Sequence, residues 1–202
     1  MFSDTQLSQS DRLGMYLYAG VGAVGIGAVL VFVIGRLIEV ARGRDIPVLV
    51  PFVDETAALP IGPGGAPVEV TVHEATVTVA DPAAATLFAL WAQPIVIGLA
   101  IIAGIVVAAL FCLRLARGLA FKKGTSRLVY TGIGILAVGW FAGSILTSMT
   151  VNGALSAVSD HTYDGTSFEF DFAPVVALLA LTVVATAFQV GERLQRETEG
   201  LV

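Results

Sequence analysis

The chain has 202 residues, of which 56% are apolar and only 13% are charged, and its mean hydropathy is +0.85. Because a soluble domain carries about 25% charged residues, this composition excludes a water-soluble globular protein and leaves room for one membrane domain without a separate soluble enzyme domain. The net charge of −5 comes from acidic loops between apolar stretches, so direct binding of nucleic acid is not expected.

Four stretches contain no charged residue, namely 13–35, 82–113, 128–159 and 172–191. A helix needs about 20 apolar residues to cross the hydrocarbon layer, so each stretch can span a membrane. The first exceeds the roughly 7–15 residues of a signal-peptide core, which favours a retained helix. The predicted fold class is therefore all-α membrane, a bundle of four transmembrane helices at about 13–37, 94–115, 128–150 and 172–191.

Small residues recur every four positions in three of these helices, a spacing that lets backbones approach closely in lipid. They are Ala19, Ala23 and Gly27 in the first helix, Ala100, Gly104 and Ala108 in the second, and Gly139 and Gly143 in the third. The spacing predicts tight packing within one bundle. It also fits a homodimer seam, and the sequence does not choose between the two.

The loop over 38–93 has strand character. Residues 47–52 are apolar between prolines, and residues 68–80 alternate apolar with polar until the alternation slips at His73 and Glu74. We predict two strands that form a small β-ribbon, with a bulge or tight turn at the slip. Residues 83–93, before Pro94, are expected to form a separate approach segment anchored by Trp91 at the membrane interface.

Eight of the 11 Lys and Arg residues lie on the side that holds the N-terminus, the 114–127 loop and the 192–202 tail, against three on the other side. The positive-inside rule predicts that both termini are cytoplasmic, in a bacterial cytoplasmic membrane, and that the ribbon lies in the first extracytoplasmic loop. The basic residues of the 114–127 loop alternate with apolar ones. This pattern indicates anchoring beside anionic headgroups, and contact with a cytoplasmic protein is the alternative.

Few residues have side chains suited to catalysis, ion transport or metal binding. The four charge-free stretches also lack His, which argues against an ion-coupled transporter, and their hydroxyls are expected to bond neighbouring backbone. Cys112 is the only cysteine, so paired-thiol redox chemistry is excluded. His73 and His161, with nearby carboxylates such as Asp164, could bind zinc, but their spacing fits no known signature. No catalytic residue, cofactor or metal is expected.

Two segments resemble a known family. Gly-Leu-Ala-Phe at 118–121, Arg-Leu-Val at 127–129 and the glycine at 132 look like the inter-helix signature of a family of four-helix bacterial membrane proteins known only as a domain of unknown function. Residues 188–194 and 197–202 are similar to the end of that family. No enzymatic activity is established for that family, and the resemblance implies a gene often placed beside a short helix-turn-helix regulator. From spacing alone, the tail continues the fourth helix, with Arg193 and Glu197 placed for an ion pair.

We therefore expect a non-enzymatic regulatory or accessory membrane protein that binds a protein partner, such as a helix-turn-helix regulator or a larger membrane complex, through its cytoplasmic face. The candidate partner-binding residues are Arg114, Arg117, Phe121, Lys122, Lys123, Arg127, Arg193, Arg196, Glu199, Leu201 and Val202. The alternative is a subunit of a transporter or channel for a small neutral or lipid-like solute, because uncharged helices permit one.

Overall fold

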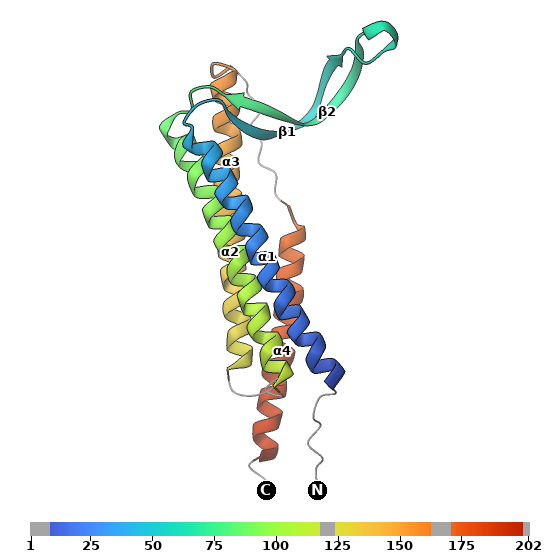
Figure 1. Cartoon of the computed structure of the whole chain (residues 1–202), viewed down its shortest axis with the longest axis vertical. Coiled ribbons are helices and arrows are strands. Elements are labelled where there is room, and N and C mark those ends of the chain that lie inside the picture. Colours follow the sequence, from blue (N-terminus) through green and yellow to red (C-terminus); the bar gives the residue numbers. More distant parts are fainter. Residues whose placement is uncertain (1–8, 118–123, 163–170, 200–202) are drawn as a thin grey trace. The chain divides into compact units, whose positions relative to one another are not determined.

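Four helices and a two-stranded antiparallel ribbon make up the computed structural model of the protein, which describes residues 9–117, 124–162 and 171–199 (Figure 1). In chain order the elements are α1 (Gln9–Ala41), β1 (Ile46–Leu59), a 3₁₀ turn (Pro63–Gly65), β2 (Val68–Val79), α2 (Ala84–Ala116), α3 (Thr125–Val158) and α4 (Ala173–Glu199). All four helices are long and apolar enough to cross a membrane. The predicted fold class, four apolar helices with a small β-ribbon, is confirmed.

The helices extend beyond the predicted spans. At 1.5 Å per residue, the 33 residues of α1 measure about 50 Å, whereas the hydrocarbon layer is about 30 Å thick. The prediction of a separate segment over 83–93 was wrong, because α2 begins at Ala84 and continues through Pro94. Proline removes one helical hydrogen bond, and the alanines and leucines before it favour helix strongly enough to carry the helix through.

The chain divides into two compact units. We call the first the span unit; it comprises Met1–Ile34, Ile95–Gly143 and Asp171–Val202. The second, the ribbon unit, comprises Gly35–Pro94 and Ser144–Phe170.

Glycines hold the helices of the span unit close together. A Cβ atom at Gly139 of α3 would collide with the Cβ atom of Ala100 in α2, and one at Gly104 would lie 2.9 Å from the side chain of Leu136. The small-residue spacing of the second and third helices is therefore a packing seam between α2 and α3. In α1, by contrast, Gly27 is open, and Gly22 and Gly25 are the glycines that meet Ile105 of the second helix.

Substituting Gly139 by alanine should lower the free energy of unfolding by about 1–3 kcal/mol, because neither Cβ atom at the contact with Ala100 can rotate away. Gly134 on the same helix is the matched control, since a Cβ atom there meets nothing within 4 Å. Gly134→Ala should be neutral or stabilising by up to about 1 kcal/mol. Reversible unfolding in detergent micelles measures both variants, and equal effects would contradict the seam.

The ribbon unit has a buried apolar core at the base of the ribbon. Its members are Val40, Ile46, Val48, Val50, Val79, Leu90, Val151, Ala154 and Leu155, from α1, both strands, α2 and α3. The side chain of Gln93 adds a hydrogen bond of 2.8 Å from its Nε2 to the hydroxyl of Thr147, between α2 and α3. Past the base, residues 55–72 include no buried residue. The base is thus fixed by packing, and the outer half of the ribbon is held mainly by its own strand pairing.

The strand register explains the slip in the sequence. Pairing runs from Ile46 opposite Val79 to Pro51 opposite Glu74, and resumes with Glu55 opposite Val72. Residues 52–54 of β1 therefore face only His73, so the predicted irregularity at His73 and Glu74 is confirmed, with the extra residues on β1. The first strand was predicted to end at residue 52, but it continues past the bulge to Leu59.

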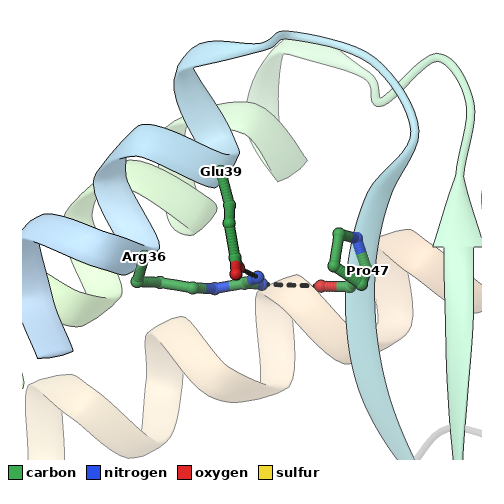
Figure 2. Close-up of polar contacts among 3 residues, drawn as sticks. All are labelled: Arg36, Glu39 and Pro47. Atoms are coloured by element: carbon green, nitrogen blue, oxygen red, sulfur yellow. Dashed lines mark hydrogen bonds and ion pairs between the residues drawn. The ribbon is translucent and has the colours of Figure 1, made fainter.

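An arginine joins α1 to the start of the ribbon (Figure 2). The Nη1 atom of Arg36 donates a hydrogen bond of 2.8 Å to Oε2 of Glu39, and its Nη2 atom donates one of 2.8 Å to the carbonyl of Pro47 in β1. The Arg36 side chain is 21% exposed, so these bonds are partly shielded from water. Arg36 therefore fixes the direction in which β1 leaves α1.

Candidate partner-binding site

The predicted partner-binding residues that the structure describes all belong to the span unit. Arg114 lies in the last turn of α2, Arg117 directly follows it, Arg127 lies in the first turn of α3, and Arg193 lies on α4. The other predicted positions cannot be placed in the same way. Phe121, Lys122, Lys123, Leu201 and Val202 lie outside the described residues, as do the side chains of Arg196 and Glu199.

The centre of the site is a carboxylate that caps a neighbouring helix. From α4, Glu192 accepts a hydrogen bond of 2.7 Å from the backbone N–H of Ser126 and one of 3.1 Å from the Ser126 hydroxyl. The first N–H groups of a helix lack partners within it and carry partial positive charge, so a carboxylate there is stabilised twice. Glu192 is only 6% exposed, so this bond is shielded from water and ties α4 to the start of α3.

The end of α2 joins the same arrangement. Nη1 of Arg114 donates a hydrogen bond of 3.4 Å to the hydroxyl of Thr125, the first residue of α3, and Thr125 is fully buried. Gly124 just before it has a φ of +100°, which a residue with a side chain rarely adopts. We call Arg114, Thr125, Ser126 and Glu192 the capped end. It brings together the end of α2, the start of α3 and the part of α4 where the apolar run ends.

Beyond the capped end, α4 continues as an exposed charged helix. The apolar part of α4 ends at Leu194, and the helix itself runs to Glu199. Nε of Arg193 lies 2.9 Å from Oε1 of Glu197, with the side chains 77% and 56% exposed, which confirms the predicted ion pair. An exposed pair of this kind contributes little stability, so its charges are available on a regular helical surface.

Uncharged contacts hold the membrane part of α4 in place. Phe188 packs edge to face on Phe111 of α2, with ring centroids 5.0 Å apart. The hydroxyl of Tyr130 in α3 lies 3.0 Å from that of Thr186, which donates its own proton to the carbonyl of Thr182. The hydroxyl of Thr182 donates to the backbone of α4 in turn, as expected for hydroxyls in the spans. These contacts give α4 a fixed position against α2 and α3.

Positive charge is in excess at this end of the span unit. Glu192 and Glu197 are engaged in the cap and the ion pair, whereas Arg117 and Arg127 are exposed and form no ion pair within the described part of the chain. A surface with this balance attracts anionic groups.

Sequence reasoning missed the role of Glu192, which it counted only as one charge of the tail. Two signals pointed to it. Glu192 directly follows Gly191 at the end of an apolar run, and Thr125 and Ser126, residues of the type that favours helix starts, stand just before another, with only Arg127 between. The 66 residues between the partners are the reason why spacing alone could not join them.

The histidines lie in the ribbon unit and do not meet. His73 is exposed opposite the bulge, and Nδ1 of His161 shares a hydrogen bond with the hydroxyl of Ser156. Asp164 lies outside the described residues. Among the residues that are described, no three His, Cys, Asp or Glu side chains are grouped so that they could hold a metal ion.

Comparison with known proteins gives no further guidance. No protein-family model, no curated protein and no solved structure matches the chain.

Proposed function

We propose that this protein is a non-enzymatic integral membrane protein that acts as a regulatory or accessory subunit. It binds a protein partner through the end of the span unit where α2, α3 and α4 meet. The partner surface comprises Arg117, Arg127 and the charged extension of α4 from Arg193 onward.

The observation that carries the proposal is the anchoring of α4 by Glu192. A charged helix that continues past its apolar part would fray on its own, because short isolated helices are marginal in water. Here the buried bond from Glu192 to Ser126 fixes the helix immediately before Arg193. The extension is thereby pre-organised, which lowers the entropy cost of binding.

The charge balance suggests the chemistry of the partner. Arg117 and Arg127 are exposed and have no ion-pair partner among the described residues, and α4 adds the alternating charges of Arg193 and Glu197. A partner with an acidic surface fits this pattern. The family resemblance makes a helix-turn-helix regulator, or a larger membrane complex that contains one, the candidate.

The distribution of basic residues supports the location. By the positive-inside rule, this end of the span unit and both termini face the cytoplasm of a bacterial cell, and the ribbon faces the outside. A cytoplasmic regulator would then have access to the extension of α4.

Photo-crosslinking in intact cells tests the proposal. A photoreactive amino acid at Arg193 or Arg117 should give a discrete protein adduct, because both side chains are exposed at the proposed surface. The control position is Val183, which is equally exposed but lies in the middle of the apolar part of α4 and should contact lipid.

Deleting residues 193–202 should abolish the adduct at Arg117 while Glu192 and the capped end remain intact. The deletion begins after Glu192 because removal of that residue would disturb the fold itself. An adduct of full strength at Arg117 in the truncated chain, or the same adducts from Val183, would refute a role for the extension.

A further inference from the structure

The second strand of the ribbon has an edge suited to accept another strand. Within the described residues the sheet consists of β1 and β2 alone, so each strand has one edge without a described partner strand. The edge of β1 is interrupted by Pro47 and Pro51, which lack backbone donors, whereas β2 has no proline from Val68 to Val79. Prolines commonly prevent an exposed edge strand from pairing with another chain, and β2 contains none.

The prolines also reveal which backbone groups of β2 point outward. Pro47 pairs with Thr78, and Pro51 pairs with Glu74. The carbonyl of Pro47 accepts a bond from Arg36 and so points away from β2, which makes these pairs the non-hydrogen-bonded kind. The N–H and C=O groups of Glu74, Thr76 and Thr78 therefore point away from β1.

This part of the ribbon is rigid. The residues between the outward-facing positions turn their side chains to the core, where Val77 is packed and Val79 is fully buried. The side chains of Glu74, Thr76 and Thr78 are exposed on the opposite face. The edge is thus held in place before any partner arrives, which lowers the entropy cost of binding.

The charge along the edge is mainly negative, and Arg44 is an exposed cation near its end, because the N–H of Asp45 bonds to the carbonyl of Ala80. Glu69, Glu74 and Asp81 are exposed along β2 and at its end. The sequence contains no Lys or Arg between Arg44 and Arg114. Two copies of this edge would repel each other, whereas a cationic strand would be attracted.

We propose that the edge of β2 from Glu74 to Thr78 binds an extended, cationic segment of another polypeptide by strand addition. Main-chain bonds to Glu74, Thr76 and Thr78 provide the affinity, and a Lys or Arg side chain on the exposed face of the incoming strand pairs with Glu74. The ribbon is then a receptor for a basic peptide segment, independent of the partner surface in the span unit.

The test uses the full chain in nanodiscs of zwitterionic lipid, which do not attract cationic peptides by charge. The probes are two labelled octapeptides, one alternating Val with Lys and the other alternating Val with Glu. The cationic peptide should bind at least 10-fold more tightly, as measured by fluorescence anisotropy. Glu74→Lys should weaken binding at least 10-fold, whereas Glu55→Lys on β1, which changes the charge of the ribbon equally, should weaken it less than about threefold.

N-methylated peptides separate strand addition from simple charge attraction. Alternate residues of a strand point their N–H groups to opposite edges, so methylation of every Val or of every Lys blocks only one edge. One methylated peptide should lose at least 10-fold in affinity and the other should bind like the parent. If both bind like the parent, the proposal is overturned. It is also overturned if the amides of Glu74, Thr76 and Thr78 are already protected from hydrogen exchange in the free protein.

Discussion

Replacing Glu192 by alanine should lower the free energy of unfolding by about 2–4 kcal/mol. The substitution leaves the backbone N–H and the hydroxyl of Ser126 without their acceptor in a partly buried place, and it removes the negative charge from the positive end of α3. Each charge-assisted hydrogen bond contributes about 1.5–3 kcal/mol, and part of this is recovered where water can enter. Reversible unfolding in detergent micelles is the measurement.

Two further variants give the expected order of effects. Glu192→Gln keeps the length of the side chain and one acceptor oxygen, so it should cost only about 1 kcal/mol. That is the contribution of the negative charge beside the positive end of α3. Glu197→Ala on the same helix breaks an exposed ion pair with Arg193 and should change stability by less than about 0.5 kcal/mol. If Glu192→Ala were as mild as Glu197→Ala, the cap would not stabilise the end of the span unit.

These variants also separate the fold from the proposed function. Glu192→Ala should weaken partner crosslinking from Arg117 and lower stability together, because it releases the base of the α4 extension. Deletion of residues 193–202 should abolish crosslinking and leave stability nearly unchanged.

Periodicity and charge predicted the features that depend on local sequence. The charge-free stretches indicated the four helices, because a helix satisfies its backbone groups within one apolar segment, as lipid requires. The slip at His73 and Glu74 indicated the bulge, since a strand that keeps one face buried must shift its alternation where its partner bulges. The spacing of Arg193 and Glu197 indicated their ion pair in the same way.

Features that depend on distant residues could not be predicted. The cap of α3 joins Glu192 to a residue 66 positions earlier, and nothing in the spacing relates the two. Pro94 indicated a helix start, yet α2 begins ten residues earlier and continues through the proline. Leu90, in the part of α2 before Pro94, is packed in the buried core of the ribbon unit. The small-residue stripe of α1 indicated packing at Gly27, but the glycines that meet α2 depend on the rotation of the helix, and Gly22 and Gly25 make that contact.

Replacing Ile46 by alanine should destabilise the base of the ribbon by about 2–5 kcal/mol, because Ile46 is 0% exposed and the cavity lies in a core of nine buried side chains. The matched control is Leu49→Ala on the same strand, since Leu49 is 58% exposed and should contribute less than about 0.5 kcal/mol. Both residues lie on β1, so the two substitutions differ in the burial of the side chain and not in the element that carries it.

The ribbon provides a direct readout of this change. It contains no Lys or Arg, so trypsin does not cut it, but a protease specific for glutamate can cut after Glu74 once the base opens. When opening is faster than cleavage, the rate follows the population of the open form, so Ile46→Ala should speed cleavage at Glu74 about 30-fold or more. Leu49→Ala should change it less than about threefold. Equal rates for both variants would mean that the edge of β2 is not held by the core, and the pre-organised edge required for strand addition would then be lost as well.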